Sequence, residues 1–83
     1  MDTMRWEYLF IDSEHERDDW RPKTSNGREV SDWKHGPAIH DFANDLGRDG
    51  WELVWSQRVL VPVGMKTENS MRLVFKRPVS QGQ

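Results

Sequence analysis

The stretch from residue 46 to residue 54, LGRDGWELV, constrains the fold of this chain more than any other segment. It joins a helical pattern to a strand pattern through Gly50 and Trp51. We predict that Gly50 adopts the left-handed conformation that ends many helices, and that Trp51 then contacts Leu46 across the helix end. Gly47 falls inside the last helical turn, where glycine costs up to about 1 kcal/mol against alanine. We therefore expect Gly47 to let the helix approach a sheet closely.

Patterned segments on both sides of this junction predict one helix and three strands. Residues 4–11, 51–61 and 71–77 alternate with the period of two that is typical of strands. Pro62-Val63-Gly64 is expected to end the second of these strands, and the polar residues 66–70 are predicted to connect it to the third. A helix is expected to begin at Pro37, with Gly36 as its N-cap, because proline suits the first helical position. The apolar stripe of this helix consists of Ile39, Phe42, Ala43 and Leu46.

The order β-α-β-β predicts an α+β fold with a three-stranded, mainly antiparallel sheet and one helix on one face, as in half of a ferredoxin-like fold. A right-handed crossover makes the first two strands parallel, and the third strand then fits between them. We expect Trp6, Tyr8 and Phe10 to face the helix. The chain is expected to form a single domain over residues 1–78, followed by a flexible tail at 79–83.

Residues 12–35 lose the apolar pattern and are predicted to form a long charged loop, punctuated by Pro22 and by Asn26-Gly27. Trp20 and Trp33 lie inside it. They either fold back to cap the small core, or they recognise a protein or a small anionic ligand together with nearby cations. The candidate binding residues in the second interpretation are Trp20, Arg21, Lys23, Arg28 and Trp33.

The sheet face that the helix leaves uncovered is expected to be half apolar. The aliphatic residues assigned to that face are Leu9, Ile11, Val54, Leu60 and Val74. Scattered aliphatic side chains on a solvated face are normal, and this is one interpretation. The other is a symmetric dimer, or a higher assembly, in which two sheets stack face to face.

Composition and charge limit the classes of function that the chain can have. The 83 residues include no cysteine, which excludes disulfides, thiolate nucleophiles and cysteine zinc sites. No apolar run is long enough for a membrane span, and a cytoplasmic protein is expected. The histidines and the acidic run lack the spacing of metal ligands, so no metal, cofactor or enzymatic activity is predicted. These residues are His15, His35, His40, Glu14, Glu16, Asp18 and Asp19.

Nucleic-acid binding is an alternative that the sequence disfavours. The formal net charge is −2, whereas nucleic-acid-binding domains are usually basic. Basic residues also alternate with the aromatic residues along the strands, so we expect the two kinds of side chain to lie on opposite faces. These basic residues are Arg5, Arg58, Arg72, Lys76 and Arg77.

Three short segments give the chain a family resemblance. They are Trp6-Glu7-Tyr8, the motif from Leu46 to Val54, and Phe75-Lys76-Arg77-Pro78. In this pattern the chain resembles the small bacterial and phage domain-of-unknown-function family 4177, over nearly its whole length, although the segment at 12–35 is longer than such proteins usually have. The resemblance implies the same fold and brings no established activity or catalytic residue.

The sequence thus predicts a non-enzymatic, homo-oligomeric binding module, most simply a dimer. It would recognise a protein or a small anionic ligand through the segment at 12–35. A nucleic-acid-binding module is the first alternative. A small enzyme whose site forms between protomers is the second.

Overall fold

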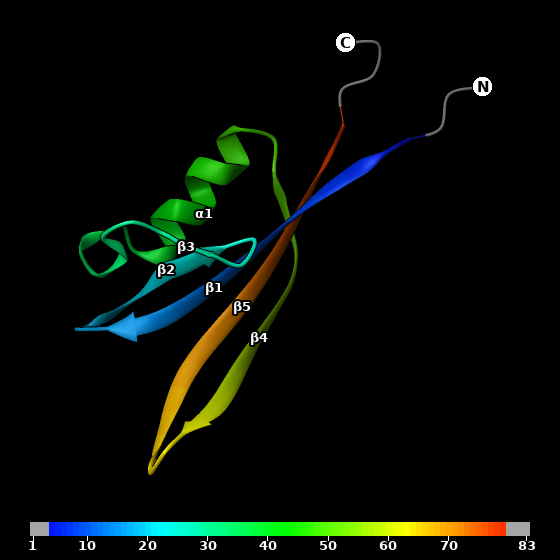
Figure 1. Cartoon of the computed structure of the whole chain (residues 1–83). Helices are drawn as coiled ribbons and strands as arrows, with labels where there is room; N and C mark the ends of the chain where they lie inside the picture. Colours follow the sequence, from blue (N-terminus) through cyan, green and yellow to red (C-terminus); the bar gives the residue numbers. More distant parts are fainter. Residues whose placement is uncertain (1–3, 80–83) are drawn as a thin grey trace.

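The computed structural model describes residues 4–79 and forms one five-stranded sheet with one α-helix (Figure 1). The sheet order is β3-β2-β1-β5-β4, and every neighbouring pair is antiparallel. The elements in chain order are β1 (Trp6–Glu16), β2 (Asp19–Ser25), β3 (Arg28–Glu29), the 3₁₀ turn η1 (Trp33–His35), α1 (Ile39–Arg48), β4 (Glu52–Val63) and β5 (Lys66–Pro78).

The α+β class is confirmed, and so is the position of the last strand. β5 lies between β1 and β4, which makes β1 and β4 run in the same direction. The predicted number of three strands is wrong, because β2 and β3 extend the sheet beyond β1. The tail prediction at 79–83 falls almost wholly outside the described residues. Val79 itself donates its backbone N–H to the carbonyl of Arg5 at 2.9 Å.

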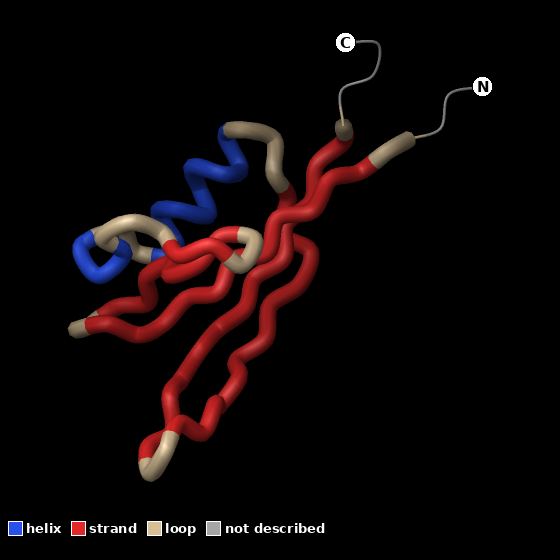
Figure 2. Tube along the Cα trace, viewed as in Figure 1, coloured by secondary structure: helices blue, strands red, loops and turns tan. Residues whose placement is uncertain are grey.

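The segment at 12–35 is mostly strand, so the prediction of a long loop is wrong (Figure 2). β1 continues to Glu16, and a two-residue turn that contains Arg17 in the left-handed region, at φ 65°, leads into β2. Asn26 and Gly27, with φ values of 50° and 82°, then connect β2 to β3. Positive φ at both central residues matches a two-residue hairpin turn, for which Asn-Gly is the favoured sequence. The Asn26-Gly27 dipeptide is therefore the feature of the sequence that indicates a hairpin in this segment.

The connection between β4 and β5 is also shorter than expected. Residues 66–70 were predicted to be a polar connection after Pro62-Val63-Gly64, but they belong to β5. The turn consists of Gly64, at φ 62°, and Met65. Polar residues fit here because this part of the hairpin extends past the rest of the sheet and meets solvent on both faces.

The end of α1 is confirmed in detail. Gly50 has a φ of 92° and donates its N–H to the carbonyl of Gly47, while Trp51 donates to the carbonyl of Leu46, each at 3.0 Å. This bond pair defines a Schellman ending. Leu46 and Trp51 also pack against the same core. The role predicted for Gly47 is wrong, because a Cβ added there would meet nothing within 4 Å.

The start of α1 lies two residues later than predicted. Ala38 is the N-cap, with extended backbone and no side-chain cap. Gly36 instead ends η1 in an extended conformation (φ −79°, ψ −174°), which agrees with the restriction that a following proline imposes.

The hydrophobic core lies between α1 and one face of the sheet. Its buried members are Ile11, Ile39, Leu73 and Phe75, and the partly buried residues packed against them include Leu9, Phe42 and Met71. Ser13 is also fully buried and donates its hydroxyl to the carbonyl of Met71 at 2.9 Å. We call the sheet face that carries these residues the helix side, and the opposite face the open face.

The faces of β1 are the reverse of the prediction. Leu9 pairs with Phe75 and Ile11 with Leu73, so both lie on the helix side. Trp6, Tyr8 and Phe10 therefore lie on the open face. The register of β4 shifts between Leu53 and Trp55, which indicates a bulge and moves Trp55 to the open face.

The molecule is elongated. Its radius of gyration is 14.8 Å, whereas a compact chain of this length is expected near 12 Å. The difference has a visible cause: the distal half of the β4–β5 hairpin extends well beyond α1 (Figure 1).

Candidate functional site

Four aromatic side chains gather on the open face, and we call them the aromatic patch: Trp6, Tyr8, Phe10 and Trp55. Their exposed fractions are 40%, 51%, 44% and 48%. In the ladder, Phe10 and Trp55 flank Val74 from either side. Val74 is only 8% exposed although it points away from α1, because large rings stand beside it. Half-exposed rings in one cluster are typical of a recognition surface.

Charged side chains lie beside the aromatic patch on the same face. The ammonium group of Lys76 lies 4.2 Å from the centre of the Trp6 ring, a cation–π contact. Lys76 also lies opposite Glu52 in the ladder. The prediction that basic and aromatic residues occupy opposite faces is therefore wrong for Lys76 and Arg72.

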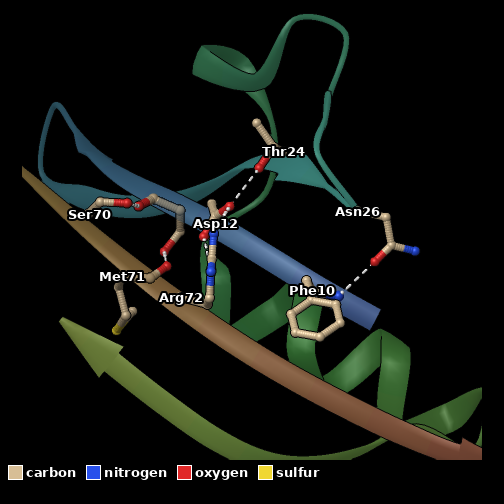
Figure 3. Close-up of polar contacts among 8 residues, drawn as sticks. Phe10, Asp12, Thr24, Asn26, Ser70, Met71 and Arg72 are labelled. Carbon is tan, nitrogen blue, oxygen red and sulfur yellow. Dashed lines mark hydrogen bonds and ion pairs between the residues drawn. The ribbon is translucent and has the colours of Figure 1, made fainter. Parts of the chain in front are cut away.

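Next along the strands, Asp12 and Arg72 form a two-point ion pair (Figure 3). Arg72 Nε donates to Asp12 Oδ1 at 2.8 Å and Nη2 donates to Oδ2 at 3.2 Å, while the hydroxyl of Thr24 donates to Oδ2 at 3.2 Å. The hydrogen bond from Arg72 lowers the pKa of Asp12, although partial burial opposes the shift, and the same bond raises the pKa of Arg72.

A second ion pair joins Lys23 Nζ to Glu14 Oε2 at 2.6 Å. The hydrogen bond to Glu14 raises the pKa of Lys23, with partial burial acting against it. Both ion pairs line a hollow of about 370 Å³ that spans four strands of the open face. Trp55, Gln57 and Val59 of β4 form its other wall, so the hollow adjoins the aromatic patch through Trp55.

The binding residues expected at 12–35 do not form one exposed site. Trp33 is 8% exposed, with the ammonium group of Lys23 at 5.3 Å from its ring centre. Trp20 packs against the core and makes an edge-to-face contact with His15 at 5.5 Å. Arg21 donates to the carbonyl of Gly36 at 2.5 Å, and Arg28 lies on β3. The interpretation in which the tryptophans cap the core agrees with the packing of Trp20. Trp33 is buried but lies outside that core cluster.

The residues expected on the uncovered face are divided. Val74 lies there as predicted, but the placement of Leu9 and Ile11 is wrong because both pack under α1. Val54 lies at the β4 bulge. Leu60 pairs with Asn69 on the helix side of the projecting hairpin, beyond the helix, and is 65% exposed.

The sequence interpretation missed the aromatic patch itself. Both alternating sets of β1 are apolar between Tyr8 and Ile11, so period two alone does not say which set faces the helix. A usable signal was Ser13, since the small residue continues the set of Leu9 and Ile11. A small side chain suits a position where another element packs closely.

Within residues 4–79, no three histidine, aspartate or glutamate residues are grouped as a metal site would require. No helix in that range is long and apolar enough to cross a membrane.

The sequence matches no family model, and the comparisons with curated proteins and with solved structures find no match.

Proposed function

We propose that this protein is a non-enzymatic binding module whose recognition surface is the aromatic patch. The observation that carries the proposal is the clustering of four rings, each 40–51% exposed, on one sheet face. Large rings supply much apolar contact area and lose little conformational entropy on binding. The proposed recognition surface is thus the open face and not the segment at 12–35 that the sequence suggested, because the two tryptophans of that segment are largely buried.

A binding role fits the state of the ionisable groups beside the patch. A catalytic acid or base works best when its pKa lies near the working pH. The lowered pKa of Asp12 and the raised pKa of Lys23 instead keep both groups charged at neutral pH. Each also faces an ion-pair partner rather than an empty position, which favours a structural role in shaping the hollow.

Photo-crosslinking tests the proposal without assuming what is bound. A photoreactive phenylalanine analogue would replace Tyr8 in cells that produce the protein, and a matched control would carry it at His40, an exposed position on α1. We expect a discrete crosslinked product from position 8 and none from position 40, resolved by denaturing electrophoresis and identified by mass spectrometry. No product at position 8, or equal products at both positions, would contradict the proposal.

Single-stranded nucleic acid is a second candidate, because Lys76 and Arg72 share a face with rings that could stack on bases. Acidic partners beside both cations weigh against it. Retention on a single-stranded polynucleotide that falls steeply with salt, and that is lost in Lys76→Gln, would favour this candidate. Salt-independent or absent retention would exclude it.

The resemblance to the domain-of-unknown-function family 4177 also stays a proposal. It rests on Trp6-Glu7-Tyr8, the motif from Leu46 to Val54 and Phe75-Lys76-Arg77-Pro78, which meet in the fold where Arg77 contacts Glu7, Asp49 and Trp51. Because these contacts stabilise the fold, the motif is compatible with a fold shared with that family. The motif assigns no activity.

A further inference from the structure

We propose that the occupant of the aromatic patch is a second copy of this chain, bound so that two open faces stack in a symmetric dimer. The inference rests on the proposed function, since it names the partner of the same surface. As in the dimer expected from the sequence, two sheets stack face to face. The interface residues differ, because Trp6, Tyr8, Phe10 and Trp55 take the place of Leu9 and Ile11.

The edges of the sheet argue for stacking rather than for edge-to-edge pairing. β3 forms one edge and is only two residues long. β4 forms the other, with a register shift after Leu53 and a proline at position 62. Short edge strands, bulges and prolines are the features by which proteins prevent sheets from extending into one another. The open face, with its four half-exposed rings, is then an apolar surface available for association.

The exposed area of the patch fits the contact of one small protomer. An aromatic side chain has about 150–250 Å² to bury, so four rings at 40–51% exposure present about 400 Å². A standard interface buries about 800 Å² on each partner. The patch thus supplies about half of that area as a central apolar cluster, and the side chains around the hollow supply a polar rim, which is the usual anatomy of an interface.

The charges of the open face favour a second copy over a polyanion. Asp12 is paired with Arg72 and Glu14 with Lys23, while Glu52 lies opposite Lys76. Acidic and basic side chains around the patch are therefore balanced, so the face does not repel an identical face. A nucleic acid or a small anion would need an excess of positive charge, which these pairs do not provide.

The test is sedimentation equilibrium on the purified full chain. Interfaces of this size give Kd values from micromolar downward, so at about 100 μM we expect twice the chain mass of 9.9 kDa. Tyr8→Glu places a charge in the patch and should raise the dimer Kd at least about thirtyfold, the level of an interface hot spot. Leu60→Glu is the matched control, because Leu60 is an exposed apolar residue on the helix side and should leave the Kd unchanged.

Circular dichroism would establish that both variants remain folded, and Trp55→Ser offers a second patch variant without a new charge. A monomeric wild-type chain at about 100 μM would overturn the dimer. If a crosslink from position 8 then leads to another molecule, the binding role survives although the inference fails. A dimer that survives Tyr8→Glu and Trp55→Ser but is lost in Leu60→Glu would place the contact elsewhere and would also overturn it.

Discussion

At the scale of single residues, two glycines of the same helix end have opposite roles. Gly50 has a φ of 92°, where a side chain is strained whatever the surrounding space. Gly47 lies within α1 at a position whose added Cβ would meet nothing within 4 Å. The backbone conformation requires glycine only at position 50.

The two alanine variants should therefore move stability in opposite directions. We expect Gly50→Ala to lower the free energy of unfolding by about 1 kcal/mol or more, because alanine is disfavoured at positive φ. Gly47→Ala should raise it by up to about 1 kcal/mol through better helix propensity. Chemical denaturation of both variants checks this. Equal effects would contradict the assigned helix ending.

The Asp12–Arg72 pair predicts a pH-dependent contribution to stability. The pKa of Asp12 is lower in the folded protein than its ordinary value of 3.8. The pair therefore stabilises the fold above that ordinary value, and this contribution disappears as the pH falls through the lower, folded-state pKa.

We expect Asp12→Asn to cost up to about 1 kcal/mol near pH 7, the range for partly exposed pairs. The difference from wild type should shrink below about pH 4. Thermal melts between neutral and acidic pH measure it. Asp45→Asn is a control, since its pair with Arg48 lies on the exposed surface of α1 and should contribute less. A difference that stays constant down to low pH would show that the charge of Asp12 is not what stabilises the fold.

At the scale of elements, Arg77 joins three parts of the fold. It lies near the end of β5 and donates to the carboxylate of Glu7 on β1. It also donates to the carbonyl of Asp49 at the end of α1, at 3.0 Å, and its guanidinium stacks 4.3 Å from the ring centre of Trp51. The three segments of the family resemblance thus meet at one side chain, which gives their motif a structural explanation.

We expect Arg77→Lys to lower the free energy of unfolding by about 1 to 2 kcal/mol, because lysine cannot serve both acceptors in one fork or stack as a plane. Arg48→Lys is the matched control and should change stability by less than about 0.5 kcal/mol, since its partner Asp45 is exposed. Urea denaturation compares the two. Similar losses in both variants would mean that Arg77 does not hold these elements together.

At the scale of the whole molecule, one helix covers one face of a sheet that has two. The core on the helix side has few fully buried side chains, and the largest aromatic residues of β1 lie on the other face. A small domain with so much apolar surface exposed gains stability when that surface is covered.

The melting temperature of the wild-type chain should therefore rise with protein concentration, because association that requires the folded state stabilises it by mass action. Tyr8→Glu should melt at a temperature that does not depend on concentration, while Leu60→Glu should behave like wild type. Differential scanning fluorimetry over a wide concentration range makes the comparison. A wild-type melting temperature that does not change with protein concentration would contradict association of the folded state.

Much of the fold could be predicted because it depends on neighbours along the chain. The end of α1 follows from the Leu46–Trp51 spacing and the glycine between them, whose geometry is local. The order of β1, β5 and β4 follows from a chiral crossover and a short hairpin, which also depend little on distant residues. The turn at Asn26-Gly27 was equally readable, and the loop prediction failed where that signal was not used.

The candidate site could not be predicted in the same way. The period of two in the sequence predicts that the side chains of β1 alternate between the two faces of the sheet. Both sets of side chains are apolar enough to be buried, so the period does not say which set faces α1. The choice was made by α1, which packs on Leu9, Ile11 and Phe75 and so turns Trp6, Tyr8 and Phe10 outward. The bulge after Leu53 then moved Trp55 to join them.

The sequence by itself determined the class of fold, the helix end and the order of the central strands, because each depends on local backbone geometry and short connections. Only the tertiary structure decided which side of the sheet became the open face and which charges stand beside the rings. Those outcomes depend on how distant elements pack, and free energies of packing are set by contacts between residues far apart in the chain.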